Sequence, residues 1–159
     1  YWARRARELG EASGNPGWDM LGMLTRLRHT DPNAVVRPEM RRLILRARAK
    51  GLRVGILSNE LELFNGPDFI SRMDVLRDMH SIVDATHTHI LKPDARAYAL
   101  GVQGLGVPAE RTLFVDDQFR NIAGAQRAGL QTQFFDLRDV DGTLAAIAAR
   151  LRIPMEDTP

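Results

Sequence analysis

Cysteine is absent from this chain of 159 residues. Its absence excludes disulfide bonds and thiol catalysis and suits a reducing compartment, so we expect a cytoplasmic protein. Long apolar runs are also missing, although 44% of the residues are hydrophobic. We therefore expect neither a membrane span nor a signal peptide. The hydrophobic content is enough for one domain-sized core, and we expect one globular body.

The chain also lacks an excess of charge of either sign. Lysine and arginine total 22 against 20 acidic residues, which gives a net charge of +2. Arginines crowd the first half, but they lie in amphipathic helical patterns, where a solvated face accounts for them. A nearly balanced charge argues against a dedicated nucleic-acid surface, so we expect no nucleic-acid partner.

Helical and extended patterns alternate along most of the chain. Two N-terminal helices are expected, over 1–9 with Gly10 as the stop and over 18–27, and a third runs from Pro38 to the stop at Gly51. The further helices are expected at 67–77, 94–105, 119–128 and 143–151. The strands are expected at 52–57, 82–83, 89–91, 113–115 and 132–135. This alternation predicts an α/β fold, a parallel sheet with helices on both faces.

Polar phrases follow three of the expected strands. Ser58-Asn59 follows the first, Lys92-Pro93-Asp94 follows the strand expected at 89–91, and Asp116-Asp117 follows 113–115. Because parallel strands end at one edge of a sheet, a hydroxyl, an ammonium and two carboxylates should meet there. These are the groups that a magnesium-assisted phosphate site needs. Each phrase alone also has a plain structural explanation, as a turn, a helix start or a helix cap.

In order and spacing, the three phrases resemble the second, third and fourth motifs of the haloacid-dehalogenase-like (HAD) hydrolase superfamily. The resemblance runs from about residue 37 to about residue 151, and Tyr98 and Asn121 belong to it. The most similar branch holds the phosphatase domain of soluble epoxide hydrolases. The resemblance implies a Rossmann-like parallel sheet with a partial helical cap, in which residues 1–36 form part of the cap and residues 37–159 form the α/β core.

The resemblance also implies a role for each candidate residue. Ser58, Asn59, Lys92 and Asn121 would bind phosphate. Lys92 would also act in catalysis by stabilising the transferring group. Asp116 and Asp117 would serve Mg²⁺, one as a ligand directly or through water and the other in support, with Asp117 counted among the catalytic residues. Which of the two carboxylates contacts the metal stays open.

The family's first motif, which carries the nucleophilic aspartate, is missing from its usual place. The phrase from Asp139 to Leu144 spells that motif, but it follows the last expected strand after three intervening residues. We interpret it as a decoy whose Asp141 or Thr143 caps the final helix, with a permuted chain as the alternative. The chain begins with Tyr1, so we expect a longer protein with the nucleophile and the central strand upstream. Neighbouring strands without that partner would be poorly stable.

With the resemblance, these patterns predict a Mg²⁺-dependent phosphomonoester hydrolase that acts on a small phosphorylated substrate, and the resemblance implies that it works through an aspartyl-phosphate. One alternative is a haloacid dehalogenase, which needs no metal; the resembling dehalogenases have a serine and asparagine pattern where this chain has Asp116-Asp117. The second alternative is an inactive HAD-like binding or scaffolding domain.

Overall fold

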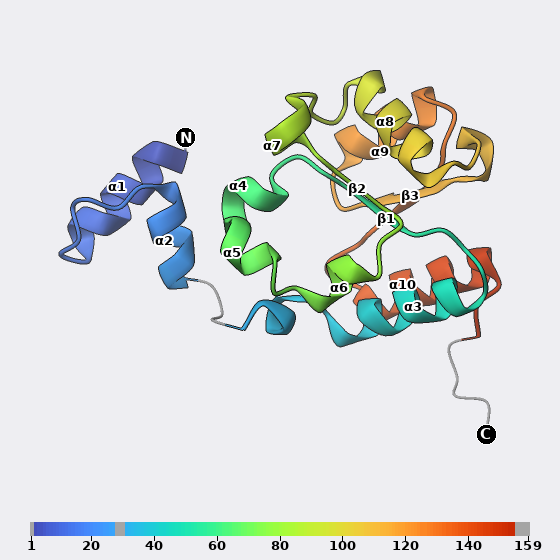
Figure 1. Ribbon diagram of the computed structural model, residues 1–159, viewed down its shortest axis with the longest axis horizontal. Coiled ribbons are helices and arrows are strands. Elements are labelled where there is room, and N and C mark those ends of the chain that lie inside the picture. Colours follow the sequence, from blue (N-terminus) through green and yellow to red (C-terminus); the bar gives the residue numbers. More distant parts are fainter. Residues whose placement is uncertain (1, 28–30, 155–159) are drawn as a thin grey trace.

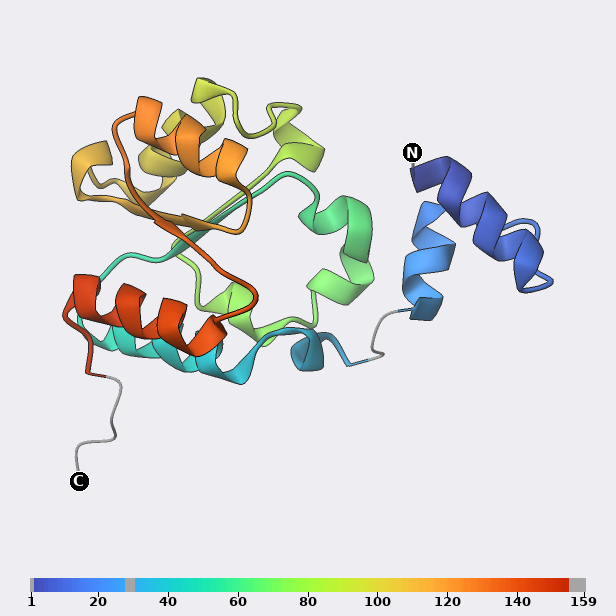
Figure 2. The same cartoon turned by 180° about the vertical axis from the view of Figure 1, so that it is seen from behind.

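The computed structural model describes residues 2–27 and 31–154. Tyr1, at which the first expected helix begins, lies outside the described residues, as do 28–30 and 155–159. Two helices, α1 (Trp2–Ala12) and α2 (Met20–Leu27), come first and contact each other. Figures 1 and 2 both show this pair at one end of the molecule, beside α4 (Leu61–Asn65). The expected stop at Gly10 is wrong, because Gly10 is buried inside α1.

Four short parallel strands form the centre of the remaining body. They make two separate sheets: β1 (Gly55–Ser58) pairs with β2 (Ser81–Asp84), and β3 (Leu113–Asp116) pairs with β4 (Gln131–Phe134). No strand of one sheet pairs with a strand of the other within the described ranges. The parallel α/β architecture expected from the sequence is therefore confirmed, and its sheet is divided into two halves.

Helices cover both faces of the strands (Figures 1 and 2). On one face lie α3 (Pro38–Ala49) and α10 (Val140–Leu151), and on the other lie α8 (Ala95–Leu105) and α9 (Phe119–Arg127). Strand β3 serves both faces, since Leu113 and Val115 pack toward α3 and α10 while Phe114 packs toward α8 and α9. This alternation is the period of two that a strand imposes, and it lets β3 contribute to the hydrophobic core on both faces.

Short helices connect the longer elements, and several of them differ from the elements predicted from the sequence. The helix expected at 67–77 is two pieces, α5 (Pro67–Ile70) and α6 (Asp74–Arg77). The strand expected at 89–91 does not form. A short helix, α7 (Ala85–Thr88), lies just before these residues, and its C-cap His89 has a left-handed φ of 56°. Short 3-10 turns η1 (Pro32–Val35) and η2 (Ala109–Arg111) complete the elements. No helix in the described ranges has the length and hydrophobicity needed to cross a bilayer.

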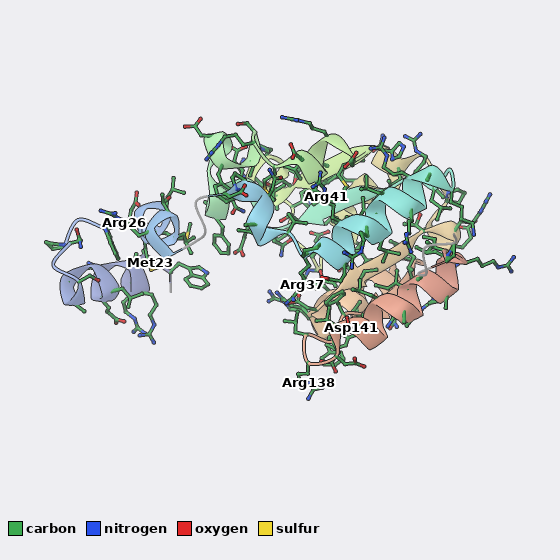
Figure 3. All side chains as sticks on the ribbon, turned by 90° about the horizontal axis from the view of Figure 1, so that it is seen from below. Met23, Arg26, Arg37, Arg41, Arg138 and Asp141 are labelled. Carbon is green, nitrogen blue, oxygen red and sulfur yellow. The ribbon has the colours of Figure 1, made fainter. Side chains whose placement is uncertain are left out.

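Helix α10 begins earlier than expected and has a different cap. Asp139 is the N-cap, and its carboxylate accepts a hydrogen bond from the Gly142 backbone N–H at 3.0 Å. Thr143 instead accepts from the backbone N–H of Asp136. The expected caps, Asp141 and Thr143, are thus replaced by Asp139. Figure 3 shows Asp141 and Arg138 at the beginning of this helix.

Candidate functional site

The polar phrases singled out from the sequence line one cleft of about 390 Å³, which we call the polar cleft. Ser58 and Asp116 are the last residues of β1 and β3, so both strands end at this cleft and run in the same direction. All six candidate residues contribute to its wall: Ser58, Asn59, Lys92, Asp116, Asp117 and Asn121. The remaining lining residues surround them: Glu60, Leu61, Phe64, Asn65, Leu91, Gln118 and Arg120.

An ion pair lies at the base of the polar cleft. Lys92 Nζ is 2.8 Å from Asp116 Oδ2, and the two side chains are only 10% and 7% exposed. The other oxygen of Asp116 accepts hydrogen bonds from the Gln118 backbone N–H at 2.8 Å and from Asn121 Nδ2 at 3.0 Å. Asp116 is therefore held on both oxygens, and it fixes the ammonium at the end of β3.

Asn59 joins the first phrase to the second. Its Oδ1 accepts from the Lys92 backbone N–H at 2.7 Å, and its Nδ2 donates to the Lys92 carbonyl at 3.1 Å. The following Lys92–Pro93 peptide bond is cis. The helix expected from residue 94 is α8, which starts at Ala95 with Asp94 as its N-cap. The amide of Asn59 thus positions the Lys92 backbone, while its predicted contact with phosphate stays a prediction.

Asp117 differs from Asp116 in its surroundings. It is exposed and has no hydrogen bond or ion pair with any other residue in the described part of the chain. Asn121 is 2% exposed, and its Oδ1 is a buried oxygen without a hydrogen-bond partner there. Of the two adjacent carboxylates, Asp116 is therefore already engaged and Asp117 is free, and Asn121 adds a free amide oxygen.

Tyr98 contacts Asn121, one of the residues that line the cleft. It is fully buried, and its hydroxyl donates to the Asn121 carbonyl at 2.8 Å. Burial, and after it the negative charge of Asp116, raises the pKa of the Tyr98 phenol, so the hydroxyl stays a donor. Tyr98 belongs to the family resemblance in the sequence, and in the structure it packs against α9.

Two supporting residues were not predicted from the sequence. Asp84, 5% exposed at the end of β2, accepts from the Leu61 and Glu62 backbone N–H groups at 3.2 and 2.8 Å and so anchors the turn after Ser58. Gly124 lies where an added Cβ would be 2.6 Å from Tyr98 Oη and 2.8 Å from Pro93 Cβ. An acidic residue at a strand end was the available signal for Asp84, but no local signal marks Gly124.

Other candidates lie away from the cleft or form no cluster. His87 is on α7, where its Nε2 is 3.1 Å from Glu62 Oε2, and it does not line the cleft. Asp139 and Asp141 lie in the first turn of α10 and do not line the cleft. Within the described ranges, no three acidic or histidine side chains are grouped closely enough to hold a metal ion by themselves.

The amino-acid sequence is similar to that of known proteins of one family. The pattern of the haloacid dehalogenase-like hydrolases matches residues 19–129. Phosphatase MT3486 of Mycobacterium tuberculosis is 31% identical over 103 residues, which are 62% of this chain and 46% of that protein. Haloacetate dehalogenase H-2 of a Moraxella species is 30% identical over 95 residues, 59% of this chain and 42% of that protein.

Solved structures show the same fold. A crystal structure of an uncharacterised protein from Corynebacterium glutamicum superposes with a TM-score of 0.65 at 22% identity and covers 82% of this chain and 91% of that chain. The chain spans less than half the length of the curated relatives that it matches. With a family pattern over most of its length and the matching fold, the chain belongs to the haloacid dehalogenase-like hydrolases.

Proposed function

We propose that the protein is a Mg²⁺-dependent phosphatase that hydrolyses a small phosphomonoester through an aspartyl-phosphate. The observation that carries the proposal is the free carboxylate of Asp117 beside the buried Lys92–Asp116 pair in one polar cleft. A phosphate group brings two negative charges, and a site with two adjacent carboxylates can accept it only if a cation offsets them. The similarity to a phosphatase supports the same conclusion.

In this proposal each polar group has a separate task. The Lys92 ammonium, held by Asp116, lies ready to contact the transferring phosphoryl oxygens. The Ser58 oxygen accepts from the Glu60 backbone N–H at 3.1 Å, which leaves its hydroxyl proton free to donate to phosphate. Asn121 orients Asp116, and Asn59 holds the Lys92 backbone in place. Ser58, Asn59 and Asn121 remain our candidates for phosphate binding.

The donor set of the cleft fits Mg²⁺. Asp116 and Asp117 supply carboxylate oxygens and Asn121 supplies a buried amide oxygen without a partner, all hard ligands of the kind that Mg²⁺ takes. When bound, the ion would neutralise phosphate oxygens as charge shifts to the leaving group. Asp117, being free, is the better candidate for a direct ligand, with Asp116 in support.

The nucleophile is the part that the described residues do not supply. The acidic residues that line the polar cleft are Glu60, Asp116 and Asp117, and none follows a buried strand in the required position other than the pair already assigned. We therefore assign the nucleophile to an aspartate outside these 159 residues. The decoy at Asp139 and Asp141 lies at the start of α10 and takes no part.

The remaining assignments belong to this proposal as well. Residues 1–36 would form part of a cap and 37–159 the core; Trp2 meets Phe64, a cleft residue, edge to face at 5.6 Å between ring centroids. The cap would then border the entrance for substrate. A chain without cysteine suits the cytoplasm.

Two other functions compete with the phosphatase. A dehalogenase is supported by the similarity to haloacetate dehalogenase H-2. Release of a halide needs no divalent cation, however, so it gives the unpaired Asp117 no role. An inactive binding domain would still bind phosphate in the polar cleft but would not hydrolyse a phosphate ester.

Phosphate affinity tests the proposal without requiring the nucleophile. Calorimetry with inorganic phosphate should show binding that needs Mg²⁺ and that falls at least about tenfold in Asp117→Asn, because the free carboxylate is lost. Asp141→Asn is the matched control and should bind as the parent chain does. Binding that is equally tight in excess chelator would contradict the metal-dependent site.

Turnover separates an enzyme from a binding domain. A longer polypeptide that contains both this chain and the nucleophilic aspartate should hydrolyse an aryl phosphate with Mg²⁺. It should leave a haloacetate intact. Halide release without phosphate release would favour the dehalogenase instead.

A further inference from the structure

Two arginines in the described part of the chain are neutralised by an aspartate that lies two residues before them. The Asp94 carboxylate accepts hydrogen bonds from Arg96 Nε at 3.1 Å and from Arg96 Nη2 at 2.6 Å. Asp136 accepts in the same way from Arg138 Nε and Nη2, both at 3.0 Å. In each pair the carboxylate takes two donors of the guanidinium and offsets its charge.

Arg120 has the same relation to Gln118, but Gln118 carries no charge. Gln118 is the N-cap of α9, and its Oε1 accepts from Arg120 Nε at 2.9 Å. An amide has one acceptor oxygen, so this contact leaves the N–H groups on both Nη atoms of Arg120 without a partner. No acidic residue in the described ranges forms an ion pair with Arg120. The guanidinium therefore keeps a positive charge that no contacting carboxylate offsets.

This guanidinium lies in the wall of the polar cleft, away from its base. Gln118 and Arg120 both line the cleft, and the Gln118 backbone N–H also holds Asp116. The Lys92 side chain at the base is 10% exposed, whereas Arg120 is an exposed residue. Because the proposed phosphate site is at Lys92, the part of a substrate that reaches Arg120 is the leaving group.

The two ends of the cleft differ in charge. Glu60, the N-cap of α4, lines the cleft near the end of β1, and its carboxylate has no hydrogen bond or ion pair in the described part of the chain. A negatively charged leaving group is repelled by Glu60 and attracted by Arg120, which lies beyond the end of β3. Charge thus favours one orientation of an anionic leaving group, toward α9.

We propose that Arg120 selects phosphomonoesters whose leaving group carries a carboxylate. The inference rests on the proposed function, because the phosphate at Lys92 determines where the rest of the substrate lies. The N–H groups on the two Nη atoms form a planar fork, and a carboxylate accepts two parallel hydrogen bonds from such a fork. Gln118 is a positioning residue: it holds the guanidinium through Nε and, being neutral, leaves the charge for the ligand.

Two phosphonates with the same carbon chain test this preference on the 159-residue chain, since their C–P bond is not hydrolysed. 3-Phosphonopropionate has a carboxylate at the far end, and propylphosphonate has a methyl group there. Calorimetry with Mg²⁺ should show that 3-phosphonopropionate binds at least about tenfold more tightly. Arg120→Gln should reduce this ratio of affinities to about one. Arg127→Gln removes the same charge from the last turn of α9, outside the cleft, and should keep the ratio.

Substitution of Gln118 tests the positioning role while Arg120 stays in place. Gln118→Asp supplies Arg120 with the carboxylate that Asp94 supplies to Arg96, so the ratio should fall toward one. Gln118→Asn is the matched neutral control and should keep the ratio. Aspartate is a favourable N-cap, so the melting temperature of Gln118→Asp should not fall. Equal ratios in the two Gln118 variants would overturn the proposal, as would a preference that survives in Arg120→Gln.

The same ligands separate this inference from the phosphatase. If both phosphonates bind with Mg²⁺ and equally tightly, the carboxylate site is overturned and the phosphatase proposal is untouched. A preference that needs Arg120 but not Mg²⁺ would support the carboxylate site and count against the metal-dependent phosphatase. Absence of binding by either ligand would overturn both.

Discussion

Lys92 and Asp116 form a buried ion pair, with side chains 10% and 7% exposed. Replacing Lys92 by methionine leaves the Asp116 carboxylate with the Asn121 amide and the Gln118 N–H but no cation. Breaking a buried pair from one side costs about 3 to 5 kcal/mol. We therefore expect Lys92→Met to lower the midpoint of denaturant unfolding and to abolish phosphate binding.

The double variant Lys92→Met/Asp116→Asn serves as the control, because it removes both charges. It should recover most of the lost stability without recovering phosphate binding. A single variant as stable as the parent would contradict the buried pair, and phosphate binding unchanged in the single variant would remove Lys92 from the site.

Asp94 offers a prediction about pH. Hydrogen bonds from the Arg96 side chain and then its backbone N–H lower the Asp94 pKa from 3.8 to about 2. A carboxyl whose pKa is lower in the folded chain adds stability that is fully present above 3.8 and is lost as the pH falls through about 2. NMR titration should give the low value in the parent chain and a value nearer 3.8 in Arg96→Gln. An unchanged pKa in that variant would contradict the Arg96 contact.

At the scale of the element, α9 owes its position to Gly124, which lets the helix approach Tyr98 and Pro93. A methyl group there would lie 2.6 and 2.8 Å from their atoms, so Gly124→Ala should cost about 1 to 3 kcal/mol of stability despite its better helix propensity. Gly101 in α8 is the matched control, since its nearest neighbour would be 3.5 Å away. Gly101→Ala should gain up to about 1 kcal/mol. Denaturant unfolding of both variants measures the two changes in stability. Equal changes would contradict the close approach of α9 at Gly124.

Prediction from sequence succeeded where one signal governs an element. Apolar runs predicted the extended pieces that became β1 and β3, and because both strands end at the polar cleft, Ser58 and Asp116 lie in its wall. It failed at 89–91, where Ile90 and Leu91 before Lys92 suggested a strand. The Asp84 carboxylate accepts from the Thr86 N–H and starts the helical turn α7 just before these residues, and His89 follows that turn in the left-handed region.

The details inside the site depend on contacts between distant segments. Asn59 binds the Lys92 backbone because the turn after β1 lies against the turn before α8. No spacing in the sequence predicts this contact. The same holds for the close approach of α9 at Gly124. A sequence pattern identifies which groups gather, whereas tertiary packing decides which of them are already engaged.

At the scale of the whole molecule, an apolar groove of about 920 Å³, which we call the central groove, lies between the two half-sheets. Its walls include Leu43, Ile56, Leu57, Val115 and Ile147, and they are open to a small hydrophobic probe. We expect the 159-residue chain to enhance the fluorescence of anilinonaphthalene sulfonate strongly, because such dyes report accessible apolar surface. Ile56→Lys places a charge in the wall of this groove and should reduce that signal, whereas Ile82→Lys, at the exposed partner position on β2, should leave it unchanged. A dye signal that Ile56→Lys leaves unchanged would place the apolar surface elsewhere.

The central groove and the polar cleft share Leu61, Asp116 and Asp117 in their walls. Two ligands that contact the same residues influence each other, and thermodynamic linkage makes the influence reciprocal. If phosphate with Mg²⁺ weakens the binding of an apolar dye in the groove by some factor, the dye must weaken phosphate binding by the same factor. The apolar groove and the polar cleft would then act as one coupled unit, in which an occupant of the groove sets how firmly the cleft holds a phosphate ester.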